Sequence, residues 1–157
     1  MIIMNIRQVV REEIERVLHG KNFSNVEYTG AIIEGDEIKK FESLLSDRLR
    51  IFGIKIPSDW KLPNNYHMTI TLGELSLGMK MSGAIGSSVV LTCHSIGVSD
   101  DAIAVGVSGL FSRNEIQHIT VAFKKKPADS KDIKNWIEFE PFKVIGYVRE
   151  VTNKNFD

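Results

Sequence analysis

The chain lacks several features that would place it in a secreted or membrane class. It contains one cysteine, Cys93, among 157 residues, so it cannot form an internal disulfide, which favours a reducing compartment. No apolar run approaches the roughly 18 to 20 residues of a membrane span. The first residues also lack the basic and apolar regions of a signal peptide. We therefore predict a cytoplasmic protein with no membrane partner.

An excess of charge of either sign is also missing. Twenty Lys and Arg residues balance twenty Asp and Glu residues. This neutral total argues against a broad surface that follows the phosphates of duplex DNA, although it permits a small basic pocket. The hydrophobic content of 43% is enough for a core without metal or disulfide support. We expect an N-terminal amphipathic helix within residues 1–20 and a single domain over residues 21–157.

The sequence also lacks the motifs of several common enzyme classes. It has no Gly-x-Ser-x-Gly nucleophile elbow, no Walker loop and no Rossmann glycine pattern. Two of its histidines, His67 and His118, have no Asp, Glu or Cys near them at metal-ligand spacing. We therefore expect no metal and no cofactor.

Against these absences, one short motif occurs twice, as His67-Met68-Thr69 and His118-Ile119-Thr120. With four histidines and six threonines, random placement would give two such pairs in roughly one chain per hundred. Both copies lie in alternating runs typical of β-strands, where side chains two apart share a face. Each strand is thus expected to direct an apolar side chain to the core and a His/Thr pair to the other face. Two half-buried strand histidines with local hydrogen bonds are the structural alternative.

The residue types in this motif suit acid–base chemistry at phosphorus. Histidine titrates near neutral pH, so one imidazole can be a general base while the other is a general acid. Threonine hydroxyls can donate hydrogen bonds to the non-bridging oxygens of a phosphoryl group. If the two strands meet, the two pairs are sufficient for in-line cleavage of a phosphodiester without a metal.

The other segments predict an α+β domain with a mostly antiparallel sheet. Helices are expected at Asn5–Leu18, from Asp36 to about Leu49, and from Asp129 or Ser130 to about Trp136. Strands are expected at Val26–Glu34, Tyr66–Glu74, Ser87–Val98, Ala102–Ser108, the run that ends near Lys124, and Phe142–Thr152. The third and fourth of these strands should form a hairpin. Residues 77–86 are expected to be irregular, with a short strand plus a turn.

The two His-x-Thr motifs, in a chain of this size, resemble those of the 2H phosphoesterase superfamily, also called LigT-like. The resemblance covers most of the chain after about Val26. It implies a bilobal α+β fold, with mostly antiparallel sheets around a central cleft and flanking helices. It also implies a catalytic tetrad of His67, Thr69, His118 and Thr120.

The segment HITVAFKKKPADSKDI is similar to the one that follows the second motif in fungal tRNA-ligase-type cyclic phosphodiesterases and in phage anti-CBASS nucleases. That similarity implies that Lys124, Lys126 and Ser130 approach the phosphate or sugar of a substrate. The first motif departs from the family pattern, because many members carry an apolar triplet before each histidine. Here Asn64, Asn65 and Tyr66 stand in its place, so that strand is expected to begin late.

Aromatic side chains that can stack on a nucleobase are also present. Tyr28 is the preferred candidate, since the opening strand borders the cleft in this family. The others are Trp60, Tyr66, Trp136 and Tyr147. Core or surface packing is the commoner role for each of these side chains.

Together these observations predict a metal-independent phosphodiesterase whose partner is a nucleotide or an RNA end. The substrate would be a cyclic oligonucleotide, as in phage evasion of CBASS immunity, or an RNA end with a 2′,3′-cyclic phosphate. A module with the same fold that sequesters a nucleotide without turnover is the alternative. A partner-binding domain that uses the N-terminal helix is a third possibility.

Overall fold

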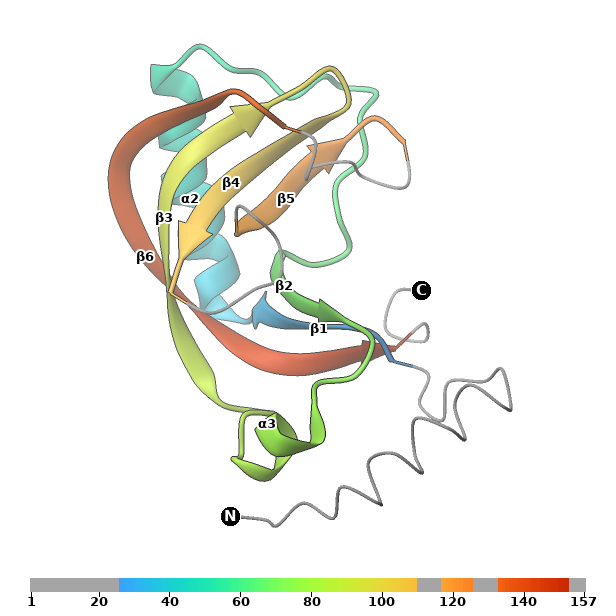
Figure 1. The fold of residues 1–157 in the computed structure, drawn as a ribbon. Helices are drawn as coiled ribbons and strands as arrows, with labels where there is room; N and C mark the ends of the chain where they lie inside the picture. Colours follow the sequence, from blue (N-terminus) through green and yellow to red (C-terminus); the bar gives the residue numbers. More distant parts are fainter. Residues whose placement is uncertain (1–25, 110–116, 126–132, 153–157) are drawn as a thin grey trace.

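The computed structural model describes residues 26–109, 117–125 and 133–152. Its elements, in chain order, are β1 (Val26–Ile33), α2 (Asp36–Ile51), β2 (His67–Leu72), α3 (Leu77–Met81), β3 (Ser88–Val98), β4 (Ala102–Ser108), β5 (His118–Phe123) and β6 (Trp136–Thr152) (Figure 1). The helix expected at Asn5–Leu18 lies outside the described residues. The predicted α+β class is confirmed.

The described strands form a closed barrel in the order β1-β2-β5-β4-β3-β6. Every pairing in it is antiparallel, as the sequence predicts. The β3–β4 hairpin is confirmed, with the partners Ile96 and Val105 near its middle. The strands β2 and β5, which carry the two His-x-Thr motifs, are neighbours although 45 residues or so separate them in the chain.

The long strand β6 closes the barrel by pairing with both β3 and β1. Residues from Trp136 to Tyr147 pair with β3, and residues from Gly146 to Thr152 pair with β1. Figure 1 shows β6 as a curved ribbon that runs from the top of the view to its lower right. This bend lets β6 pair with β3 along its first part and with β1 along its last part.

The helix α2 covers one face of the strands. Its apolar stripe is confirmed: Phe41, Leu45 and Leu49 are buried in the main core. Polar contacts also hold the helix on β6, because the Glu37 carboxylate accepts a hydrogen bond from the Ile145 backbone N–H at 2.8 Å. Burial of the stripe is the main stabilising contribution, at about 25 cal/mol per Å² of apolar surface.

The expectation for residues 77–86 was wrong in one respect, because a short helix, α3, replaces the predicted strand. Ser76 caps it, and the Ser76 Oγ accepts a hydrogen bond from the Met79 backbone N–H at 3.3 Å. Lys80 fixes its other side through contacts with Glu74 at 2.9 Å and Glu150 at 3.2 Å. Five residues are too few to carry a helical hydrophobic period, so the sequence pattern could not reveal this helix.

The helix predicted to end at Trp136 was also wrong at that end, while its predicted start lies outside the described residues. Residues 133–135 are irregular, and Trp136 begins β6. The last strand is therefore six residues longer than the predicted Phe142–Thr152. Pro141 lies between Glu138 and Phe142, where the pairing with β3 shifts and a missing N–H is tolerated.

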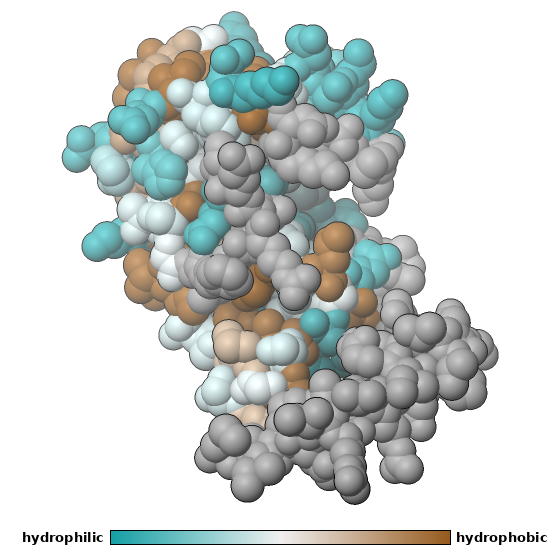
Figure 2. Space-filling view, viewed as in Figure 1, coloured by the Kyte–Doolittle hydropathy of each residue, from teal (hydrophilic) through white to brown (hydrophobic). Residues whose placement is uncertain are grey.

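The face of the molecule drawn in Figure 2 mixes hydrophobic and hydrophilic residues. Hydrophilic residues gather at the upper right, and hydrophobic residues reach the surface through the middle of the view. Leu72, Met79 and Met81 are among the large exposed hydrophobic residues. No helix within the described ranges is long and apolar enough to cross a membrane.

The tight packing over β3 gives a first prediction, for the Gly97→Ala variant. A Cβ atom at Gly97 would lie 2.6 Å from Ile133 Cγ2 and 2.7 Å from the Trp136 ring. We expect overpacking to lower the free energy of unfolding by about 1–3 kcal/mol, measured by urea denaturation. The control is Gly78→Ala, whose Cβ would meet nothing within 4 Å and should stabilise α3 by about 0.5–1 kcal/mol. Equal stabilities for the two variants would contradict this packing.

Candidate functional site

The pairing of β2 with β5 brings the two His-x-Thr motifs together. Met68 of β2 is the partner of Ile119 of β5 in an antiparallel ladder. Both side chains are fully buried and belong to the main core. Because neighbouring side chains on a strand alternate between faces, the flanking His and Thr residues point away from that core.

The antiparallel register also decides how the four side chains are arranged. His67 lies across from Thr120, and Thr69 lies across from His118, on the same face of adjacent strands. Such opposed residues have Cβ atoms about 4.5–5.5 Å apart. All four side chains are partly exposed. The sequence therefore predicted correctly both the strand setting and the shared orientation of each pair.

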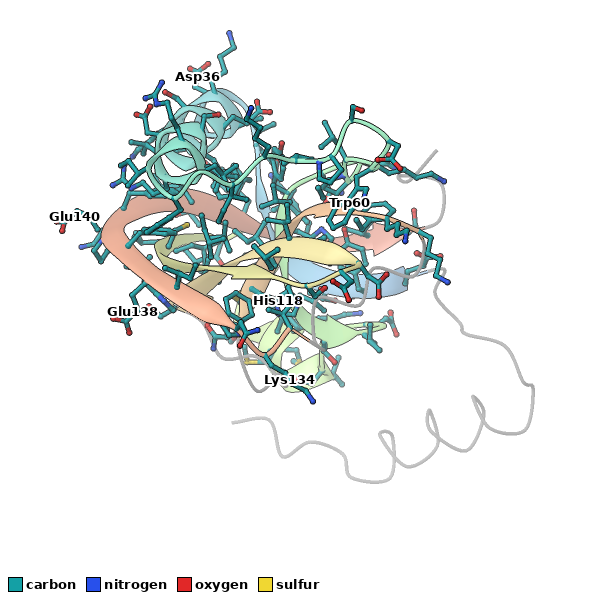
Figure 3. The ribbon with its side chains drawn as sticks, turned by 90° about the horizontal axis from the view of Figure 1, so that it is seen from above. Asp36, Trp60, His118, Lys134, Glu138 and Glu140 are labelled. Carbon is teal, nitrogen blue, oxygen red and sulfur yellow. The ribbon has the colours of Figure 1, made fainter. Side chains whose placement is uncertain are left out.

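Small residues of β4 continue this face beside the second motif. Gly106 is the partner of His118, and Ala104 is the partner of Thr120. Figure 3 shows His118 near the middle of the molecule, on the side of β3 and β4 away from α2. The site is thus built on rigid strands, with the packed core directly beneath it.

Comparisons of the chain with protein-family models, curated proteins and solved structures found no match. The resemblance to 2H phosphoesterases therefore rests on the two motifs and on the positions of their residues.

Asn65 and Tyr28 surround the imidazole of His67. The Nδ1 atom of His67 lies 2.6 Å from Asn65 Oδ1 and 3.2 Å from the Tyr28 hydroxyl. The Tyr28 hydroxyl also donates a hydrogen bond to Asn65 Oδ1, at 3.2 Å. In addition, the rings of Tyr28 and His67 are stacked, with centroids 4.3 Å apart and planes 23° from parallel. His67 is therefore held both at one ring edge and on one ring face.

This enclosure lowers the pKa of His67 to about 4. Burial is the main cause, since removing the ring from water penalises the imidazolium. A hydrogen bond to the Asn65 backbone acts in the opposite direction, and the nearby charge of His118 lowers the pKa further. The electrostatic effect of His118 is a second sign that the two histidines belong to one site. At neutral pH, His67 is an uncharged imidazole.

Tyr28, the preferred candidate for base stacking, lies in the site but packs on His67. Its side chain is only 6% exposed. Burial raises the pKa of its hydroxyl to about 12, so the group stays protonated and can donate. A β-bulge between Thr29 and Gly30 shifts the register of β1 against β2, and Gly30 leaves room for the Tyr28 ring. The contacts of Tyr28 thus assign it to His67.

The other predicted substrate contacts lie apart from these rings or outside the described residues. Lys124 is exposed at the end of β5, where its backbone N–H donates to the Asp101 carbonyl at 2.8 Å. Lys126 and Ser130 lie outside the described residues. Trp60 packs against the main core, which agrees with its structural alternative.

Other reactive groups offer little in this part of the molecule. Within the described ranges, no group of three or more His, Cys, Asp or Glu residues is arranged to hold a metal ion. Cys93 is buried, and burial raises the pKa of its thiol to about 12. The thiol is therefore protonated at neutral pH and is a poor nucleophile. The four residues of the two motifs are the candidates for chemistry on this face.

Asn65 is the site residue that the sequence analysis missed. In the sequence it stands out only as a departure from the apolar triplet of the family. A signal was nonetheless present, because Asn65 stands two residues before His67, and side chains at this spacing share a face in extended chain. A polar residue at that position can reach the histidine ring.

Proposed function

We propose that the chain is a metal-independent phosphodiesterase that cleaves RNA-type phosphodiester bonds. The pairing of Met68 with Ile119 is the observation that supports this most directly. It puts two imidazoles and two hydroxyls on one face, at the spacing of neighbouring strands. The finer fold, a bilobal arrangement of the 2H type around a central cleft, belongs to the same proposal.

In the proposed reaction, His67 is the general base. It is uncharged at neutral pH, since its pKa is lowered to about 4, and so it can accept a proton from a water or a ribose 2′-hydroxyl. That oxygen then forms a bond to phosphorus in line with the leaving oxygen. His118 gives its proton to the leaving oxygen as the old P–O bond breaks. Solvent exchange afterwards returns both imidazoles to their starting states.

The hydroxyls of Thr69 and Thr120 complete the proposed site. Each can donate a hydrogen bond to a non-bridging oxygen, where negative charge accumulates in the transition state. A bound phosphate also acts on His67, because a nearby anion favours the imidazolium. Substrate binding should thus raise the pKa of His67 from about 4 towards the working pH, where a general base is most effective.

The substrate class follows from the chemistry and from the charge of the chain. A 2′-hydroxyl as internal nucleophile requires RNA-type linkages, and the neutral total charge favours a compact ligand over a duplex. A cyclic oligonucleotide supplies this 2′-hydroxyl, whereas an RNA end with a 2′,3′-cyclic phosphate is opened by water, with a ring oxygen as the leaving group; both ligands are compact. A cyclic oligonucleotide substrate would give the chain a role like that of phage anti-CBASS nucleases.

The proposal predicts turnover of at least one substrate in a defined panel. The panel contains cyclic dinucleotides, cyclic trinucleotides and an RNA that ends in a 2′,3′-cyclic phosphate, with products separated by chromatography. We expect linear or ring-opened product in the presence of a chelator, because no step uses a metal. Intact ligand after long incubation, together with measurable binding, would instead indicate a sequestering module.

A further inference from the structure

The hydrogen bonds of Asn65 identify which nitrogen of His67 carries the proton. An amide oxygen has lone pairs and no hydrogen. Its contact with His67 Nδ1 at 2.6 Å is therefore a hydrogen bond only when Nδ1 is protonated. The Tyr28 hydroxyl uses its single proton to donate to the same Asn65 oxygen, at 3.2 Å. Both donors thus converge on one acceptor, and Nε2 of His67 is left with its lone pair.

The stacked Tyr28 ring fixes the plane in which that lone pair lies. Its centroid is 4.3 Å from that of His67, and the planes differ by 23°. Rotation of the imidazole about its Cβ–Cγ bond would break this stack and the hydrogen bond to Asn65 at once. A half-turn of the ring, which exchanges the positions of Nδ1 and Cδ2, is opposed by the hydrogen bond to Asn65.

A register shift between β1 and β2 accompanies this arrangement. It lies between Thr29 and Gly30, where β2 carries the extra residue, Ile70. A Cβ atom at Gly30 would lie 2.8 Å from the Met68 carbonyl and 3.3 Å from the Tyr28 ring. The strand that carries Tyr28 can approach β2 this closely because residue 30 has no side chain.

We propose that Asn65 and Tyr28 are positioning residues that hold His67 with its proton on Nδ1 and with Nε2 as the atom that accepts a proton. Asn65 selects the tautomer, and Tyr28 holds the ring plane. Neither residue takes part in the bond changes at phosphorus. The catalytic meaning of this inference rests on the proposed function, but the protonation of the ring nitrogens does not.

The groups that face His67 from the neighbouring strands are known for the described residues. Tyr28 faces it from β1, and His118 faces it from β5 through its charge. Asn65, which precedes β2, carries no charge. The Tyr28 hydroxyl stays protonated well above neutral pH, so it adds no charge in the range where the experiment is made.

Nitrogen NMR of the full-length protein with ¹⁵N-labelled histidine tests this directly. At pH 7 the wild type should give the pattern of a neutral imidazole with the proton on Nδ1, assigned by comparison with His67→Ala. In Asn65→Ala the proton should move largely to Nε2, the commoner tautomer of free histidine. Asn65→Asp keeps an acceptor oxygen in place, and it should restore the wild-type tautomer.

Two variants of Tyr28 separate its ring from its hydroxyl. Tyr28→Phe keeps the stack and leaves Asn65 to accept from Nδ1, so the tautomer should stay unchanged. Tyr28→Ala removes the ring that covers His67, so the pKa of His67 should rise from about 4 towards its usual value. Identical titrations of His67 in these two variants would overturn the role given to the ring.

The kinetic readout follows if the panel yields a substrate. Asn65→Ala should reduce kcat by up to about a hundredfold, the cost of a misplaced catalytic group, with little change in KM. Asn65→Asp should recover most of that loss. A wild-type His67 with its proton on Nε2, or an Asn65→Ala variant with an unchanged tautomer, would overturn the inference. A tautomer that responds as expected in a protein without any turnover would reject the phosphodiesterase and leave the positioning role standing.

Discussion

Replacing His118 with alanine should lower the rate of phosphodiester cleavage by about a hundred- to ten-thousand-fold, the range typical of one general acid or base. The physical reason is the position of its ring. It lies on the same face as His67, on the neighbouring strand, where one imidazole can act on each side of a phosphate. His67→Ala should cost a similar factor. The measurement is kcat at saturating substrate, with product followed by chromatography.

His94→Ala is the matched control for these two variants. His94 lies on β3, where its ring lies over Gly106 of β4, and it has no threonine two residues later. Its removal should leave kcat within a few-fold of the wild-type value. Full activity in either His67→Ala or His118→Ala would reject the two-imidazole mechanism.

The stability of the protein should fall steeply between pH 6.5 and pH 4 because of His67. An unfolded chain protonates this histidine near its ordinary pKa of 6.5, whereas the folded protein resists protonation down to about 4. In this window the unfolded state binds more protons, so acid favours unfolding. At about 1.36 kcal/mol per pKa unit, the loss approaches 3 kcal/mol at pH 4. The stabilising effect is complete above pH 6.5.

The contribution of His67 can be separated from that of the carboxylates by comparing variants. Urea unfolding of the wild type and of His67→Gln, measured at pH 7 and at pH 4.5, gives the change in stability for each. His67→Gln has no imidazole to protonate, so its stability should fall less over this interval. His94→Gln serves as the control and should fall as the wild type does. Parallel losses in the wild type and His67→Gln would mean that His67 is not protected from protons.

The sequence was sufficient to predict that each His-x-Thr motif lies on a strand, but not that the two strands pair with each other. Alternation alone indicates that Met68 and Ile119 face the core while the His and Thr residues face the other way. Which strands become neighbours is decided by packing of the whole chain, and no local pattern records that β5 inserts between β2 and β4. The family resemblance implied that the two His-x-Thr motifs lie close together. The pairing of Met68 with Ile119 places them on neighbouring strands.

The contacts around His67 explain why the role of Tyr28 in the structure differs from the base stacking predicted from the sequence. The strand pattern predicts that Tyr28 points to one face of β1, which suits base stacking. The β-bulge after Thr29 changes the register locally and brings the ring onto His67. Bulges depend on the partner strand, so a one-dimensional pattern does not reveal them. For the same reason, the sequence alone does not reveal the role of Asn65, because that role depends on the positions of both Tyr28 and His67.

The pH dependence of turnover tests the central claim, that two imidazoles act on one phosphate as base and acid. The wild type should give a bell-shaped profile, because one group must be deprotonated and the other protonated. His67→Ala should lose the acidic limb and keep the alkaline one, while His118→Ala should lose the alkaline limb and keep the acidic one. An unchanged bell in either variant, or the loss of the same limb in both, would contradict the account.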